Sequence, residues 1–255
     1  MNTYFYDDYE IAELSYFEYK HLVKSFISAD GEKLIKIFER LLSSKIKAER
    51  RLHIGDKIKI LLLLRCLILG EEININYEGK NYNYNLNTMI DSIAFNKKDF
   101  CYNDMVFKVP RNLFYSSKFS CLIDNFHSFK LNGEIKIIDE YTYKQKELIL
   151  QNLLQMKVSN LVKEFSEYLE NFSIGYINNI TINLFDINLL KLIKNFYTSD
   201  LNEMYNLEYN ILHFLKFDSN VFDIYGLPEL IIFVNKFNKE QEELSKKSGN
   251  KNIDL

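Results

Sequence analysis

Apolar side chains recur every three or four positions in the first third of the sequence, and this spacing predicts α-helices with one buried face. Ser15 and Glu18 form a capping-box pattern, in which each side chain accepts a hydrogen bond from the backbone amide of the other. A helix is therefore expected to start there and to continue to about residue 28. Further helices are expected at residues 32–43 and 56–69, and the latter is apolar on nearly all sides, as is typical of a helix at the centre of a domain.

In the middle of the chain the pattern changes to an alternation of apolar and polar residues, which predicts β-strands. Residues 73–77 and 82–86 alternate on either side of a Glu-Gly-Lys turn, so they are expected to form a hairpin with one aromatic face. A second hairpin is expected around the Asn-Asp pair at residues 103–104. A third is expected around Asn132-Gly133, because Asn-Gly favours the tight turn that joins antiparallel strands.

From Thr142 onward the pattern predicts helices again, with one further β element. The predicted helices cover residues 143–155, 159–171, 187–197, 201–216 and 228–244, and the β element covers residues 177–185. The expected fold class is α+β and mainly helical, with a helical core, β-hairpins inserted in the N-terminal half and a helical C-terminal half. A boundary is expected where the pattern changes, so that residues 1–139 and 140–245 form two parts and residues 246–255 a disordered tail.

Composition indicates an ordinary globular protein and argues against several function classes. The chain has 255 residues, of which 47% are hydrophobic, and a formal net charge of -3 at pH 7, which argues against holding nucleic acid by bulk charge. The three cysteines are widely spaced and odd in number, as in a cytoplasmic protein with reduced thiols. No secretory leader is recognisable at the N-terminus, and the longest apolar stretch, residues 58–69, is too short to span a membrane.

The sequence contains no local motif for a cofactor. The four histidines lie far apart, and no Cys-x-x-Cys or His-x-x-x-His pair occurs, so no metal site is expected. The glycine-rich phosphate-binding motifs are missing as well, so no nucleotide cofactor is expected.

One pattern leaves an enzymatic alternative open. Glu134 and Lys136 lie on a predicted strand with Asp124 upstream, and restriction-type nucleases use a Glu-x-Lys pair beside an aspartate to hold magnesium. The other interpretation is a solvent-exposed hairpin face, because polar residues are expected next to the Asn-Gly turn.

Two segments are candidates for contact with other proteins. The N-terminal segment is aromatic and acidic, and tyrosine is enriched at interfaces; its candidate residues are Tyr4, Phe5, Tyr6 and Tyr9. The second segment connects two predicted helices in a region where nine basic and four acidic residues lie between residues 32 and 59, and its candidate residues are Arg50 and Arg51. A chain end packed on itself and a solvated helix connection are the alternative interpretations.

The order of these features is similar to that of one protein family. Residues 14–20 read Leu-Ser-Tyr-Phe-Glu-Tyr-Lys at a helix start, and residues 225–230 read Tyr-Gly-Leu-Pro-Glu-Leu at another. Between them lie the apolar helix Asp-Lys-Ile-Lys-Ile-Leu-Leu-Leu-Leu-Arg, the segment Gly-Glu-Glu-Ile and the Tyr-rich hairpin. This order resembles the baseplate hub and hub-assembly proteins of contractile-tailed bacteriophages of the T4 type, over residues 10–240.

The resemblance implies a non-enzymatic protein that forms part of a phage tail baseplate or helps to assemble it. The partners it implies are other tail proteins, with no small-molecule substrate, no nucleic acid and no membrane span, and an oligomer is compatible with this role. The implied location is the host cytoplasm during assembly, and the tail baseplate for a permanent component. No functional residues are carried over, because the matching segments are helix starts and stops without a catalytic signature.

Overall fold

The structure is a computed structural model, and it describes residues 3–7, 9–47, 52–77, 79–154, 158–176 and 180–247. It is 56% helical with 20% strand in small sheets, which confirms the predicted α+β, mainly helical class. The chain forms two compact units. The first unit contains Met1–Lys47, Leu64–Glu71 and Lys194–Leu255, and the second contains Ala48–Leu63 and Glu72–Ile193.

These units interleave along the sequence, and the boundary expected at Asp139 lies inside the second one. The physical reason is that the chain on either side of Asp139 packs together. Helix α6 (Tyr143–Leu154) contacts α5 (Lys118–Asn125), and the Lys146 ammonium donates to the backbone oxygen of Asp124 over 3.4 Å. The expected tail is described only as far as residue 247, which is the end of helix α11 (Leu227–Lys247).

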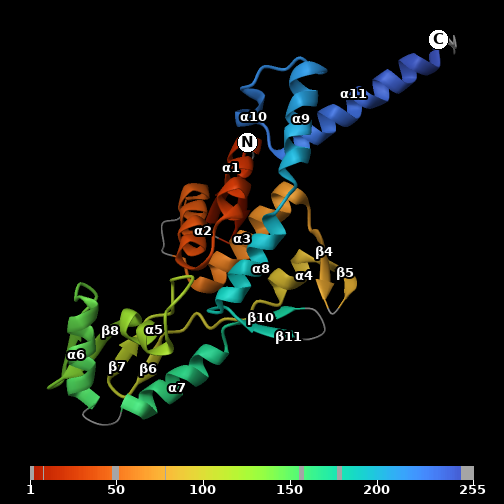
Figure 1. Cartoon of the computed structure of the whole chain (residues 1–255). Helices are drawn as coiled ribbons and strands as arrows, with labels where there is room; N and C mark the ends of the chain where they lie inside the picture. Colours follow the sequence, from red (N-terminus) through yellow and green to blue (C-terminus); the bar gives the residue numbers. More distant parts are fainter. Residues whose placement is uncertain are drawn as a thin grey trace. The chain divides into compact units, whose positions relative to one another are not determined.

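The first unit combines helices from the first and last parts of the chain (Figure 1) with a small antiparallel sheet. Its helices are α1 (Tyr16–Ile27), α2 (Gly31–Lys45), α9 (Leu201–His213), α10 (Val221–Ile224) and α11. Its sheet has the order β1 (Thr3–Tyr6), β2 (Tyr9–Ala12), β3 (Ile46–Lys47). The capping box at the start of α1 is confirmed, since Ser15 Oγ accepts from the Glu18 amide over 3.2 Å and the Glu18 carboxylate accepts from the Ser15 amide over 2.8 Å.

Buried tyrosines connect α1 to the C-terminal part of the first unit. Tyr16 donates its hydroxyl hydrogen to the backbone oxygen of Met204 over 2.7 Å, and Tyr19 donates to the backbone oxygen of Tyr197 over 2.9 Å. A buried hydroxyl without such a partner is destabilising, so these bonds select one packing of the helices. Burial also raises the pKa of Tyr19, so its phenol remains a hydrogen-bond donor at alkaline pH values where an exposed tyrosine begins to ionise.

Helix α3 (Ile54–Leu69) is the apolar helix that the sequence predicts, and it ends at Gly70. Gly70 has a φ of 81°, a left-handed conformation that glycine adopts without strain at the C-terminus of a helix. Arg65 is buried within this helix, and its guanidinium donates to the backbone oxygens of Phe196 and Gly70. The buried positive charge of Arg65 is therefore stabilised by hydrogen bonds to two backbone carbonyl oxygens.

The second unit contains all three hairpins that the sequence predicts. They are β4 (Glu72–Tyr77) with β5 (Lys80–Asn85), β6 (Phe100–Tyr102) with β7 (Met105–Phe107), and β8 (Phe126–Leu131) with β9 (Glu134–Ile137). The last four strands form one antiparallel sheet in the order β6-β7-β8-β9. Asn132 and Gly133 both have positive φ, 50° and 86°, as a two-residue turn between strands of normal twist requires.

The β element expected at residues 177–185 is confirmed in part. Strand β11 (Ile180–Asn183) lies within this range, and residues 177–179 are outside the described residues. The strand that was not predicted is β10 (Ser173–Tyr176), which pairs with β11 in a hairpin. A lone strand would leave its backbone groups unpaired, and the antiparallel return satisfies them. The other helices of this unit are α4 (Leu86–Asp91) and α7 (Val158–Glu170), and α8 (Ile187–Tyr197) follows β11 and ends in the first unit.

Aromatic rings form the core of the second unit. Phe107 stacks on Phe126 with ring centroids 4.9 Å apart, and Phe165 of α7 lies edge-on to Phe100 at 5.3 Å. Three of these four side chains are fully buried, so β6, β7, β8 and α7 share one apolar cluster.

Among the described helices, none has the length and apolar content required to cross a membrane.

Candidate functional site

The C-terminal helices of the first unit carry a group of exposed apolar side chains. We name these residues of α9, α10, α11 and the segments between them the C-terminal apolar surface: Tyr205, Tyr209, Leu212, Phe214, Phe217, Ile224, Tyr225, Ile231 and Ile232. Each of them is more than one third exposed. Single exposed apolar residues are normal, but a concentration of them in one part of a fold is typical of a binding site for another molecule.

Local hydrogen bonds position these helices. The Asp200 carboxylate accepts from the Asn202 amide over 2.8 Å and starts α9, and the Glu229 carboxylate accepts from the Gly226 amide over 2.8 Å and starts α11. A Cβ at Gly226 would lie 2.9 Å from a carboxylate oxygen of each of Glu13 and Glu229, so a larger residue here would require these two flexible side chains to move. The two hydrogen bonds therefore define where α9 and α11 begin.

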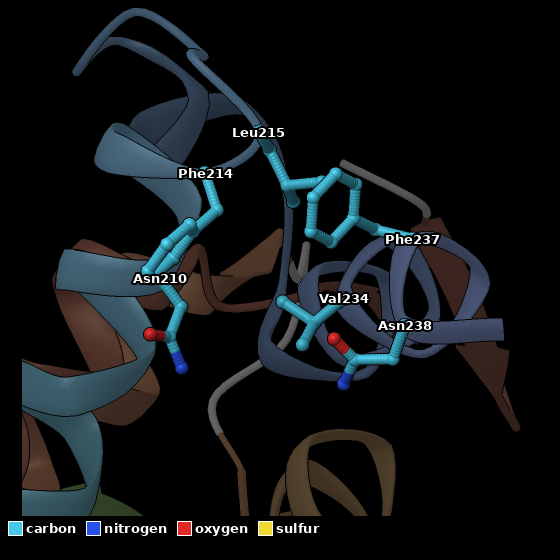
Figure 2. Close-up of a pocket in the computed structure, with 6 residues that line it drawn as sticks. All are labelled: Asn210, Phe214, Leu215, Val234, Phe237 and Asn238. Carbon is cyan, nitrogen blue, oxygen red and sulfur yellow. The ribbon is translucent and has the colours of Figure 1, made fainter. Parts of the chain in front are cut away.

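A pocket with a volume of about 210 Å³ lies between α9 and α11, and Phe214 of the C-terminal apolar surface is part of its lining. Figure 2 shows its lining, which combines apolar side chains with two amide side chains at its wall: Asn210, Phe214, Leu215, Val234, Phe237 and Asn238. Helix α11 begins beside α9 and extends beyond it (Figure 1). The pocket is smaller than the sites that enclose drug-sized ligands, and its size fits a single side chain of a partner protein.

Several aromatic side chains of this part of the first unit contact one another. Phe233 lies edge-on to Phe217 at 5.6 Å and to Tyr225 at 5.2 Å, and Tyr209 lies edge-on to Phe214 at 6.0 Å. Ordered aromatic side chains lose little entropy on binding, so such a cluster is suited to anchor a partner.

The N-terminal candidate residues lie in the β1–β2 hairpin. Tyr6 pairs with Tyr9 next to the turn, and Phe5 pairs with Glu10. Phe5 is 77% exposed and lies on the edge strand β1, whereas Tyr6 and Tyr9 are only partly exposed. Within the N-terminal segment Phe5 therefore offers a partner the largest apolar area relative to its size. The other candidates, Arg50 and Arg51, are outside the described residues.

The three residues of the nuclease hypothesis are not brought together. Asp124 lies just before β8 begins at Phe126, whereas Glu134 pairs with Leu131 at the far end of the strand. The five steps from Phe126 to Leu131, at about 3.3 Å per residue, place the two ends of β8 about 16 Å apart. Glu134 instead forms an ion pair with Lys136 over 2.6 Å, and the Asp124 carboxylate accepts from the Asn112 amide side chain over 2.8 Å. The arrangement does not provide the common metal shell that this hypothesis requires.

A buried polar cluster at the start of α3 is a feature that sequence reasoning missed. The Asp56 carboxylate is only 1% exposed, and neither of its oxygens has a hydrogen-bond partner in the structure. The Lys97 ammonium lies 3.5 Å from it. His53 Nδ1 and Arg111 Nε are also buried without a hydrogen bond. In the described part of the chain, no group of three or more histidine, cysteine, aspartate or glutamate side chains is arranged to hold a metal ion.

This cluster predicts a pH dependence of folding. Burial lowers the pKa of His53, and the nearby cations Arg111 and Lys97 lower it further, while the carboxylates of Asp56 and Asp99 oppose the shift. As the pH falls below about 6.5, the unfolded chain binds a proton at His53 before the folded chain does, so the free energy of unfolding should decrease. Unfolding by urea at several pH values should show this decrease, and His53→Gln should reduce it.

The exposed His21 provides the matched control for this measurement. We expect His21→Gln to retain the pH dependence of the wild-type protein. An identical pH dependence in His53→Gln and wild type would show that His53 does not contribute.

Comparison with known proteins identifies no relative. No protein family, curated protein or solved structure matches the chain.

The sequence does contain a signal for the C-terminal apolar surface. Phe217 and Tyr225 lie between the helices predicted at residues 201–216 and 228–244, in a segment that also contains charged and polar residues such as Asp218. Large aromatic residues in a connection between helices do not belong to the buried face of a helix. They therefore either pack beneath the connection or remain exposed for contact with a partner. The periodicity of the helices does not distinguish these two outcomes.

Proposed function

We propose that this protein is non-enzymatic and acts through protein–protein contacts, as a component of a contractile bacteriophage tail baseplate or as a factor that assembles it. Its partners are other tail proteins. It works in the host cytoplasm during assembly, and a permanent component would remain in the baseplate of the particle.

The observation that carries this proposal is the C-terminal apolar surface with its pocket between α9 and α11. Exposed aromatic rings around a small apolar pocket suit an anchor side chain inserted by a partner protein. The amide side chains of Asn210 and Asn238 at the pocket wall supply donors and acceptors for the polar rim of such a contact. The identity of the partners as tail proteins depends on the similarity in sequence order.

A capture experiment tests the proposal. The tagged full-length protein is expressed in phage-infected cells, bound proteins are identified by mass spectrometry, and purified particles are analysed in parallel. We expect tail proteins among the captured proteins. Stoichiometric presence in particles would identify a permanent baseplate component, and binding in the lysate without presence in particles would identify an assembly factor. Capture of no tail protein in either sample would overturn the proposal.

A further inference from the structure

Strand β9 forms an uncovered edge of the four-stranded sheet in the second unit. All four of its residues are exposed, with Ile135 at 71% and Ile137 at 65%. Ile137 pairs with Ser128 of β8, which is buried on the same face of the sheet as Phe126. The two isoleucines therefore continue the core-facing side of the sheet beyond the part that is covered. An apolar edge strand of this kind is a template for pairing with another chain.

The backbone of β9 presents hydrogen-bonding groups at this edge. The Ile138 amide donates to the backbone oxygen of His127 in β8 over 2.8 Å. In an antiparallel pair, successive residues alternate between bonding to the neighbouring strand and pointing away from it. Residues 134 and 136 therefore bond to β8, and Ile135 and Ile137 direct their N–H and C=O groups to the open edge. The Lys130 amide, opposite Ile135, donates away from β9 to Asp104 over 2.9 Å, which agrees with this alternation.

The charged side chains of β9 lie on the other face of the sheet. Their order along the strand lets two antiparallel copies of β9 place opposite charges next to each other. Glu134 and Lys136 form an ion pair over 2.6 Å, and both side chains are at least half exposed. When two copies of this strand are placed antiparallel with Ile135 opposite the partner's Ile135, each Glu134 lies opposite a Lys136. Moving one copy by two residues along the strand places Lys136 opposite Lys136 in one direction and Glu134 opposite Glu134 in the other. Like charges directly opposite each other are destabilising, so charge selects the first register.

We propose that β9 pairs antiparallel with β9 of a second copy of this chain, with Ile135 at the two-fold axis. The pairing joins two four-stranded sheets into one sheet of eight strands. It uses the outward backbone groups of Ile135, places the two Ile135 side chains in contact, and forms two Glu134–Lys136 pairs between the copies. The interface is isologous and closes after two copies.

Sedimentation equilibrium of the purified full-length protein tests this pairing. The wild-type protein should form a concentration-dependent dimer. Lys136→Glu replaces both attractive cross-strand pairs with repulsive ones and should raise the dimer dissociation constant about tenfold or more. The double variant with Glu134→Lys and Lys136→Glu exchanges the charges but keeps the strand complementary to itself, so dimerisation should return. Circular dichroism of each variant checks that the exposed substitutions leave the fold intact.

Each outcome decides the proposal. Loss of the dimer in Lys136→Glu with recovery in the double variant would establish the antiparallel register. A wild-type monomer at all concentrations would overturn the pairing. A dimer that Lys136→Glu does not weaken would use another surface, and a double variant as weak as Lys136→Glu would exclude charge complementarity between two β9 strands. Because the measurement uses the isolated protein, its result is independent of whether tail proteins are captured.

Discussion

Replacing Phe165 with alanine is expected to lower the free energy of unfolding by about 3–5 kcal/mol, because the substitution leaves a cavity in a core that cannot collapse fully around it. Phe165 is fully buried on α7, and its ring lies 5.3 Å from that of Phe100, 6.2 Å from that of Phe107 and 5.7 Å from that of Tyr168. These rings belong to three separate elements, so the loss affects the packing of α7 on the sheet. Urea unfolding followed by circular dichroism measures the change.

Tyr141 provides a matched control for this substitution. It is an aromatic residue of the same unit, but it is 47% exposed in the connection before α6. Tyr141→Ala should therefore cost about 1 kcal/mol or less. Equal costs for the two substitutions would contradict the assignment of Phe165 to the centre of the aromatic core.

Replacing Phe214 with alanine is expected to weaken binding of the captured tail protein about 30-fold or more, equivalent to about 2 kcal/mol. Phe214 lines the pocket between α9 and α11 and is 56% exposed in the protein alone (Figure 2). An aromatic side chain in this position contributes contact area that only a partner covers. Because more than half of the Phe214 side chain is exposed without a partner, the free energy of unfolding should change by no more than about 1 kcal/mol. Titration calorimetry with the purified partner measures the first effect, and urea unfolding measures the second.

Ile27 is the control for the binding measurement. It is an apolar residue of the first unit, on α1, and it is 68% exposed but outside the C-terminal apolar surface. Ile27→Ala should leave the affinity unchanged. Unchanged affinity in Phe214→Ala would exclude the pocket as the main contact, even if the protein still binds tail proteins through another surface such as the β1–β2 hairpin.

The sequence by itself determined the features that depend on a few neighbouring residues. The capping box at Ser15 and Glu18, the end of α3 at Gly70 and the turn at Asn132-Gly133 form as predicted, because each is stabilised by hydrogen bonds or backbone angles within one short segment. The fold class follows from the same local patterns. The expected strand at residues 177–185 forms in part, at residues 180–183, but its pairing with residues 173–176 is not visible in periodicity alone.

Only the tertiary structure decided which distant residues meet. It separates Asp124 from Glu134 along β8, places the Asp56 carboxylate inside the second unit beside Lys97, and joins the first and last parts of the chain in the first unit. It also leaves Phe214 and the two isoleucines of β9 exposed although their residue type favours burial. Burial is determined by what packs over a side chain, and that depends on long-range contacts that the identity of a residue and its neighbours does not specify.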